Sequence, residues 1–238
     1  YIQDQYHGIG RYAFQLMHHL VALGSGHQFV VFWNPALPNT RFDLHGLLAR
    51  PNVEARVLRL PLYWPQEQLV LPLIAQQLRL DLLHVPYFCT PLLAPCRLVL
   101  TVHDLIFERH PDYMPRRWAR GYYRLLMTLG LRRASATVVN SEATRRDLLE
   151  HYRLPAGKVA VTTHAVDDTY RPADPDKIAA VRRRYGLPDA YMVSVGTRRP
   201  NKNIAAVVRA LGRIRDRIPH TLVLVGKRDP RFPDDVSP

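Results

Sequence analysis

Short apolar runs alternate along this chain with segments of helical periodicity, and this alternation constrains the fold more than any other feature. Residues 10–23 place apolar side chains at helical spacing, and residues 28–33 form a short apolar run typical of a buried strand. Further strands are expected at 53–60, 82–85, 97–103, 136–140 and 158–163, and helices at 66–80, 116–133 and 141–152. Ser141 is placed to cap the last of these helices, and Pro72 to kink the first. The pattern predicts an α/β fold with a doubly wound parallel sheet.

A break in this pattern near residue 170 divides the chain. We expect residues 1–170 to form a Rossmann-like first domain that lacks its opening strand, and 171–188 to form a linker and a basic helix ending at Gly186. Residues 189–238 then begin a second Rossmann-like domain, as one βαβ unit that this chain leaves incomplete. Its expected parts are a strand at 191–195, a turn at 196–202, a helix at 203–218 and a strand at 221–225. Asp174 and Asp176 in the linker suit helix capping better than metal binding.

The chain is strongly basic, with 33 Lys and Arg against 20 Asp and Glu and a net charge of +13. All but four of the basic residues are arginines, and they are dispersed among apolar segments. Such a field attracts phosphates, whereas nucleic-acid tails usually run in blocks of charge. A basic Rossmann-like module that binds nucleic acid or anionic lipid remains an alternative, but we expect no nucleic-acid partner.

Several classes of protein are excluded by what the sequence contains. Two cysteines, Cys89 and Cys96, are too few for a disulfide scaffold or a four-cysteine zinc site. No apolar run is long enough to span a bilayer, and no basic-then-apolar leader opens the chain, so a cytoplasmic protein is expected. Because Tyr1 is not an initiator methionine, the chain is expected to be a fragment.

The segment 116–133 combines six arginines with interfacial aromatic residues such as Trp118, and no acidic residue lies between Asp112 and Glu142. A basic amphipathic helix of this kind suits peripheral contact with the anionic inner face of a membrane. The same composition suits a helix that packs on the sheet with its arginines outward. Both interpretations stay open.

Candidate site residues lie just after the predicted strands, where parallel sheets bind ligands. Gly8, Ile9 and Gly10 open a helix, so backbone N–H groups and the helix dipole can approach an anion there, unless they form only a tight turn. His103 follows a strand and can donate a hydrogen bond to a sugar hydroxyl or a phosphate, with Asp104 setting its tautomer. The alternative is a loop histidine satisfied by the backbone.

The turn that begins at Gly196 carries Arg198, Arg199 and Lys202 beside a helix N-terminus. Three cations in that place form a pocket for a diphosphate, or else a solvated basic turn. The turn lacks the spacing of a Walker loop, which disfavours ATP hydrolysis. The chain also lacks the Gly-x-Gly-x-x-Gly motif followed by an acidic residue, which disfavours a dinucleotide-dependent oxidoreductase.

Five short motifs follow one another along almost the whole chain. They are Gly-Ile-Gly-Arg-Tyr from Gly8, Thr-Val-His-Asp-Leu from Thr101 with Arg-His-Pro-Asp-Tyr from Arg109, Val-Val-Asn-Ser-Glu from Val138 with Arg-Arg-Asp-Leu from Arg145, Lys-Val-Ala-Val from Lys158 through Val166-Asp167, and Gly-Thr-Arg-Arg-Pro-Asn-Lys-Asn from Gly196. Together they resemble the GT-B fold glycosyltransferases of family 4, the group 1 type, especially the mannosyltransferase-like members.

The resemblance implies a retaining, metal-independent transfer of a sugar such as mannose. The donor would be a GDP- or UDP-linked sugar, with no other cofactor, and the acceptor a glycan or a lipid-linked molecule, as in polysaccharide biosynthesis. The first domain would hold the acceptor and the second the donor. By similarity, His103 and Asp104 are the catalytic pair, and the donor-binding residues are Gly8, Ile9, Gly10, Gly196, Arg198, Arg199 and Lys202.

The chain departs from the family pattern in three places. Thr197 stands where an arginine is common, and His164-Ala165 stands where an Asn-Gly pair is usual. The paired glutamates expected near the donor ribose and sugar would lie beyond Pro238. We therefore expect the 238-residue chain alone not to catalyse transfer, because positioning both substrates contributes about 7 kcal/mol or more to such reactions.

Overall fold

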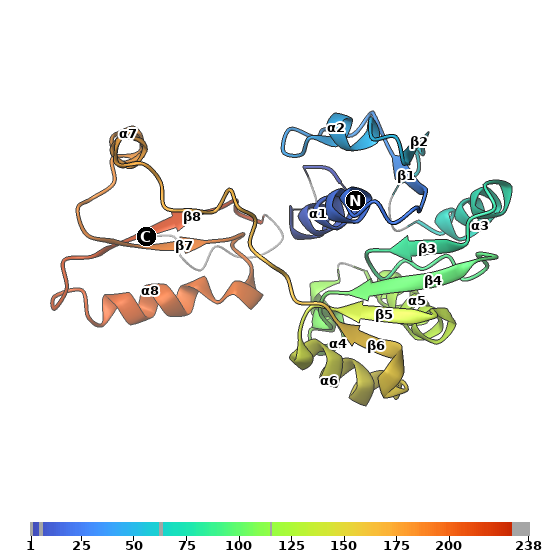
Figure 1. The fold of residues 1–238 in the computed structure, drawn as a ribbon. Coiled ribbons are helices and arrows are strands. Elements are labelled where there is room, and N and C mark those ends of the chain that lie inside the picture. Colours follow the sequence, from blue (N-terminus) through green and yellow to red (C-terminus); the bar gives the residue numbers. More distant parts are fainter. Residues whose placement is uncertain (1, 5–6, 62–63, 115, 230–238) are drawn as a thin grey trace. The chain divides into compact units, whose positions relative to one another are not determined.

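The computed structural model describes residues 2–4, 7–61, 64–114 and 116–229 (Figure 1). The chain divides into two compact units, which we call unit 1 (Tyr1–Ala165) and unit 2 (Val166–Pro238). The longer helices of unit 1 are α1 (His7–Ala22), α2 (Leu44–Leu48), α3 (Glu67–Gln77), α4 (Ile106–Arg109), α5 (Arg117–Arg133) and α6 (Glu142–Tyr152). Its strands are β1 (Phe29–Trp33), β2 (Val53–Val57), β3 (Leu82–Val85), β4 (Arg97–Val102), β5 (Ala136–Val139) and β6 (Val159–Val161). Two 3-10 turns, η1 (Pro111–Tyr113) and η2 (Ala156–Lys158), complete it.

The strands of unit 1 form two parallel sheets. One sheet holds four strands in the order β3-β4-β5-β6, and the other is the pair β1-β2. Every pairing is parallel, with Leu82 opposite Arg97 and Val99 opposite Ala136. The prediction of an α/β fold with a parallel sheet is confirmed. Among the described residues β1 pairs only with β2 and β3 only with β4, so the two sheets are separate.

The main core of unit 1 lies on β4 and the helices that cover it. Leu98 and Leu100 of β4 are 0% exposed, and Leu126 and Leu131 of α5 pack in the same cluster. A parallel strand covered on both faces is apolar along its length, which explains why the sequence of β4 predicted a buried strand. A smaller cluster, around Val21 and Leu47, joins α1 and α2 to the β1-β2 pair.

Several predicted helix ends are confirmed by hydrogen bonds. Ser141 caps α6, because its hydroxyl accepts a bond from the Thr144 N–H at 3.1 Å. In unit 2, Asp174 caps α7 (Pro175–Tyr185) by accepting from the Asp176 N–H at 3.0 Å. Gly186 ends α7 in the left-handed conformation, with φ 57°.

Unit 2 contains one complete βαβ arrangement. Strands β7 (Tyr191–Val195) and β8 (Thr221–Val225) pair in parallel and are connected by the turn η3 (Pro200–Lys202) and α8 (Ile204–Gly212). The predicted helix over 203–218 is therefore too long. It ends at Gly212 because glycine is a poor helix former and Arg213 follows as the C-cap, with its N–H bonded back to the last turn.

Four short elements of unit 1 escaped the sequence prediction, and α1 begins three residues earlier than expected. The missed elements are α2, α4, η1 and η2. The signal for α2 is Asp43, whose carboxylate accepts a bond from the Gly46 N–H at 2.9 Å. Helices of three to five residues show too little periodicity to be found by pattern alone.

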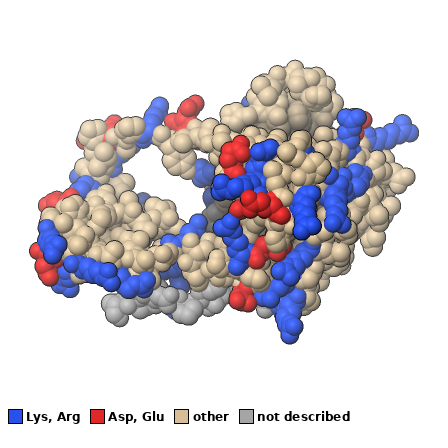
Figure 2. All heavy atoms as spheres, turned by 90° about the horizontal axis from the view of Figure 1, so that it is seen from below, with Lys and Arg blue, Asp and Glu red and all other residues tan. Residues whose placement is uncertain are grey.

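Helix α5 packs against the sheet of unit 1. Tyr123, Leu126 and Met127 are buried, while Trp118 is 58% exposed and Leu125 also faces outward. The expectation of a helix packed on the sheet is confirmed. Figure 2 shows that on the face it presents, Lys and Arg side chains are spread over both units with Asp and Glu side chains among them. Among the residues described, no helix has both the length and the apolar character needed to cross a membrane.

Candidate functional site

The carboxyl ends of the four parallel strands in unit 1 meet at one edge of the sheet, and aromatic and histidine side chains gather there. His103 directly follows β4, and His164 follows β6 by three residues. Tyr12 reaches the same edge from α1. Its ring lies 4.8 Å from that of His103 and 5.4 Å from that of His164, and the two histidine rings are 6.2 Å apart, centroid to centroid. With His84 and Thr101, these residues form what we call the carboxyl-edge cluster.

A chain of hydrogen bonds fixes Tyr12 within the cluster. The Thr101 hydroxyl, on a side chain that is 1% exposed, lies 2.8 Å from His84 Nε2 and 3.0 Å from the Tyr12 hydroxyl. Burial, together with the nearby His103, lowers the pKa of His84 to about 4. Burial raises the pKa of Tyr12, although its bond to Thr101 opposes this. Both side chains are therefore uncharged near neutral pH, so the bonds position Tyr12 without burying a charge.

The ring of His103 is oriented by the backbone of the next loop. Its Nε2 lies 3.1 Å from the Pro86 carbonyl oxygen, which can only accept a hydrogen bond, so Nε2 carries the proton. The pKa of His103 is lowered, first by burial and then by His164, while the Pro86 bond and Asp104 oppose this shift. A neutral His103 protonated at Nε2 leaves Nδ1 as an acceptor for a ligand hydroxyl.

This geometry corrects two details of the expected site. The group that sets the His103 tautomer is the Pro86 carbonyl and not Asp104. Asp104 instead accepts a hydrogen bond from the Ile106 N–H at 3.0 Å, which stabilises the start of α4. We had expected His103 to donate to the ligand, but its donor is already used, so it is placed to accept.

The glycine motif lies in the first turn of α1, beside the cluster. Because α1 begins at His7, Gly8 and Ile9 stand among the first residues of the helix, whose N–H groups have no partner within it. A side chain at Gly8 would meet nothing within 4 Å, so the backbone there is open to a ligand. Tyr12 lies one turn further on, on the same side of the helix as Gly8. The first turn of α1 therefore offers an anion site next to His103.

Unit 2 carries the other predicted site residues on the loop between β7 and α8. Gly196 and Gly226 directly follow the two strands with φ 155° and 148°, and a Cβ on Gly226 would overlap the Gly196 carbonyl oxygen. Glycine is thus required where the strand ends meet. Just beyond, the Arg198 N–H donates to the Lys227 carbonyl at 3.1 Å.

Two of the three cations of this loop, Arg199 and Lys202, have different surroundings. Arg199 Nε donates to the buried Asp229 carboxylate at 2.7 Å, which offsets its charge. Lys202 is exposed at the end of η3, and Asn203, with φ 49°, starts α8 without a side-chain cap. The N–H groups at the start of α8 therefore lie beside the Lys202 cation.

Sequence reasoning missed four members of the carboxyl-edge cluster as site residues: Tyr12, His84, Thr101 and His164. Thr101 and Tyr12 stand inside quoted motifs, so their nearness to a strand end and a helix start was a usable signal. His164 was noted only as a departure from a family pattern. No cluster of three or more potential metal ligands occurs within residues 2–4, 7–61, 64–114 and 116–229.

Comparison with known proteins identifies the family. The sequence profile of Glycosyltransferase Family 4 matches residues 6–170, which is more than half of the chain and contains the whole carboxyl-edge cluster. The chain belongs to glycosyltransferase family 4. The family region covers almost all of unit 1.

Individual known proteins also resemble this chain. The family 4 chain is 29% identical over 143 residues to the O-antigen chain mannosyltransferase B of Escherichia coli, covering 59% of this chain and 37% of the relative. Its fold resembles that of Alr3699/HepE from Anabaena in complex with UDP and glucose, with a TM-score of 0.62 and 19% identity over 92% of this chain and 60% of that one. The same protein in complex with UDP-glucose gives a TM-score of 0.54 and 21% identity over 77% and 50%. The chain thus spans between about a third and three fifths of the length of these relatives.

Proposed function

We propose that this family 4 chain is part of a retaining, metal-independent glycosyltransferase that moves a sugar from a nucleoside-diphosphate donor to a glycan or lipid-linked acceptor. The observation that carries the proposal is the position of His103, which ends a central strand of unit 1 beside the glycine-opened first turn of α1 and the fixed ring of Tyr12. An acceptor group for a sugar hydroxyl and an anion site for the diphosphate thus lie together.

The expected chemistry assigns a role to each unit. The bond between the anomeric carbon and the diphosphate oxygen breaks, and the acceptor hydroxyl oxygen bonds to that carbon on the same face while its proton passes to the departing diphosphate. His103 Nδ1 accepts from a donor-sugar hydroxyl. The α1 N-terminus stabilises the negative charge that develops on the leaving diphosphate. In unit 2, Lys202 and Arg198 are proposed as donor-binding cations. Arg199, held by Asp229, supports the shape of that loop.

The identity of the transferred sugar is proposed from the relatives. The E. coli relative is named a mannosyltransferase, and we propose mannose for this chain. The Anabaena structures hold UDP with glucose or UDP-glucose, which supports a nucleotide sugar as the donor class. GDP-mannose and UDP-glucose are therefore the two donors to test.

We propose that the 238-residue chain alone does not catalyse sugar transfer. In unit 2 the strands β7 and β8 leave Val193, Val195 and Val225 largely exposed, so little of that unit is packed well enough to hold a donor rigidly. Incubation with labelled donors and a pool of glycan and lipid acceptors should give no transfer above the hydrolysis background. Transfer above background would refute this claim and would itself establish the sugar-transfer function.

Nucleotide-sugar binding tests the proposed function directly. GDP-mannose and UDP-glucose are titrated into the chain by calorimetry at rising salt, with AMP and a mixed-sequence DNA duplex as controls. We expect saturable binding of a nucleotide sugar with a shallow salt dependence. Tighter binding of DNA with a steep salt dependence, and no preference for nucleotide sugars, would support the basic binding module instead.

Peripheral contact with an anionic membrane is also proposed, through residues 116–133. Helix α5 exposes Trp118 and Leu125 next to Arg117 and Arg124, a combination that suits an anionic lipid surface. The Trp118→Ser variant should reduce co-sedimentation with phosphatidylglycerol vesicles, and Trp64→Ser, at an exposed tryptophan outside α5, is the matched control. Equal pelleting with neutral and anionic vesicles at low salt would contradict the proposal.

A further inference from the structure

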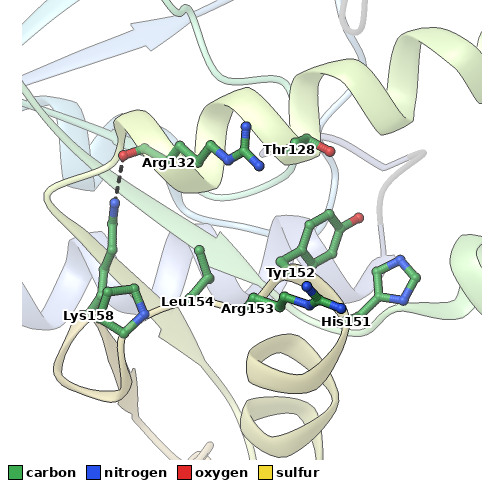
Figure 3. A pocket seen from close by; sticks show the side chains of 8 residues that line it. Thr128, Arg132, His151, Tyr152, Arg153, Leu154 and Lys158 are labelled. Carbon is green, nitrogen blue, oxygen red and sulfur yellow. Dashed lines mark hydrogen bonds between the residues drawn. The ribbon is translucent and has the colours of Figure 1, made fainter.

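A pocket of about 450 Å³ lies in unit 1 away from the carboxyl-edge cluster. It is bounded by the ends of α5 and α6 and by the loop that leads into β6 (Figure 3). Lys158 directly precedes β6, and Arg132 stands just before β5, so the pocket adjoins the amino-terminal ends of the strands. The residues that line it are Thr128, Arg132, His151, Tyr152, Arg153, Leu154, Pro155 and Lys158.

The pocket is cationic. Arg132, Arg153 and Lys158 line it, and none of its lining residues is acidic. Figure 3 shows the guanidinium groups of Arg132 and Arg153 coming from two different helices, with the Tyr152 ring between them in that view. Within the described part of the chain, neither guanidinium has a hydrogen bond or an ion pair. The two guanidinium groups therefore line one pocket, and their N–H donors are available to a ligand.

The partial negative charges at the carboxyl ends of α5 and α6 do not account for these cationic side chains. Lys158 Nζ donates to the Arg132 carbonyl oxygen at 2.6 Å, and this bond already satisfies the last turn of α5. Burial lowers the pKa of Lys158, as expected for an ammonium group held against the protein. The carboxyl ends of two helices carry about half a negative charge each, whereas the pocket holds three cationic side chains. The two guanidinium groups are in excess.

The backbone at Arg153 is a second sign that its side chain serves a purpose. Arg153 ends α6 in the left-handed conformation, with φ 53° and ψ 48°, where glycine or asparagine is the usual residue. A long side chain at this position costs free energy relative to glycine. The conformation directs the chain toward Leu154 and Pro155, which also line the pocket.

We propose that this pocket binds a phosphate group. Arginine forks match phosphate oxygens with paired, charge-assisted hydrogen bonds, and the Thr128 hydroxyl can add another. A pocket of this volume accommodates a phosphate with a small organic ester. The phosphate can belong to a lipid headgroup or to a free phosphoester. Leu125 and Leu129, exposed on the same face of α5 as Thr128 and Arg132, would lie beside a lipid. The proposal does not rest on the proposed transferase function.

The test follows the arginine side chains themselves. Inorganic phosphate is titrated into the ¹⁵N-labelled chain, and the Nε–Hε resonances of Arg132 and Arg153 are assigned from their loss in Arg132→Gln and Arg153→Gly. Both resonances should move together and saturate, and each single variant should weaken binding at the other resonance about tenfold or more. The Arg50→Gln/Arg59→Gln double variant, which removes two exposed charges outside the pocket, should leave the titration unchanged.

Thermal unfolding separates binding from folding. Arg153→Gly should leave the melting temperature unchanged or raise it, because glycine suits the left-handed position, while phosphate binding is lost. A variant that lost stability and binding together would overturn the proposal in favour of a structural role, as would resonances that drift without saturating.

A further experiment identifies the source of the phosphate, by adding glycerol phosphate or vesicles of phosphatidylcholine containing phosphatidylglycerol. If the vesicles shift the Arg132 and Arg153 resonances, the phosphate belongs to a lipid headgroup. If only glycerol phosphate shifts them, the phosphate belongs to a free phosphoester.

Discussion

Units 1 and 2 use the same local arrangement of parallel strands and helices but bury very different amounts of it. In unit 1 the strand β4 is covered so fully that Leu98 and Leu100 have no exposed surface. In unit 2 the equivalent apolar strand β7 leaves Val195 76% exposed, and Ile204 of α8 is its buried hydrophobic residue among those described. Both strands are short apolar runs, so their sequences look alike. Among the described elements, only unit 1 has enough helices and strands around such a run to bury it in a core.

This difference bears on function. The carboxyl-edge cluster has fixed geometry because its residues stand on strands and helices anchored in the core of unit 1. The loop of Gly196 to Lys202 depends on a two-stranded sheet and on the Arg199–Asp229 ion pair. We expect unit 1 to be the rigid half of the chain and unit 2 the half that opens locally.

The largest expected effect is a difference in the cost of core truncation between the units. Leu100→Ala in β4 should lower the free energy of unfolding by about 2–5 kcal/mol, because it leaves a cavity in a closed core. Val195→Ala in β7 should change it by less than about 0.5 kcal/mol, because that side chain is largely exposed. Urea unfolding followed by circular dichroism measures both. Similar losses for the two variants would show that unit 2 is packed as well as unit 1.

The carboxyl-edge cluster should make unit 1 sensitive to acid. The pKa of His84 is about 4 in the folded chain and about 6.5 in an unfolded chain. Above about pH 6.5 both states are neutral, but below it the unfolded state binds the proton first, so stability falls until about pH 4 by roughly 3 kcal/mol. Across this pH range, the free energy of unfolding measured with urea should fall less steeply with decreasing pH for His84→Gln than for the parent chain. Equal slopes would remove His84 as the cause.

A substitution in the loop of Gly196 to Lys202 should change ligand binding and not stability. Lys202→Ala should weaken nucleotide-sugar binding by about 10²-fold, because an exposed cation beside the α8 N-terminus offsets diphosphate charge. Lys177→Ala, on the exposed face of α7, is the matched control and should bind normally. Calorimetry with GDP-mannose and UDP-glucose checks this, and unchanged affinity in the Lys202 variant would take that residue out of the site.

A smaller and local effect is expected where the two strands of unit 2 end. Gly226→Ala should destabilise the unit by about 1–3 kcal/mol, because its Cβ would overlap the Gly196 carbonyl oxygen. Gly212→Ala, where nothing lies within 4 Å, should stabilise α8 by up to about 1 kcal/mol. Hydrogen exchange at the Gly196 N–H, which bonds the Val225 carbonyl at 2.9 Å, reports both changes. Effects of the same sign would contradict the close approach.

The sequence predicted every described strand and the parallel arrangement, but not which strands pair with which. Apolar runs such as that of β4 depend on near neighbours, and caps such as Ser141 depend on residues within one turn, so both are visible in a linear pattern. The separation of β1-β2 from the four-stranded sheet and the early end of α8 depend on which segments meet in space. The same holds for the site. His103 could be predicted from its place after a strand, whereas His84, 19 residues earlier in the chain, joins it only through the pairing of β3 with β4.

The most direct test of the account is to map donor binding onto unit 1. Backbone amide resonances of the labelled chain are followed while GDP-mannose or UDP-glucose is added, with AMP as the control. The account predicts saturable shifts at Gly8 and Gly10 in the first turn of α1 and at His103, and their loss in His103→Ala. Saturable donor binding that leaves these three amides unchanged would contradict the assignment of the carboxyl-edge cluster as a glycosyltransferase site.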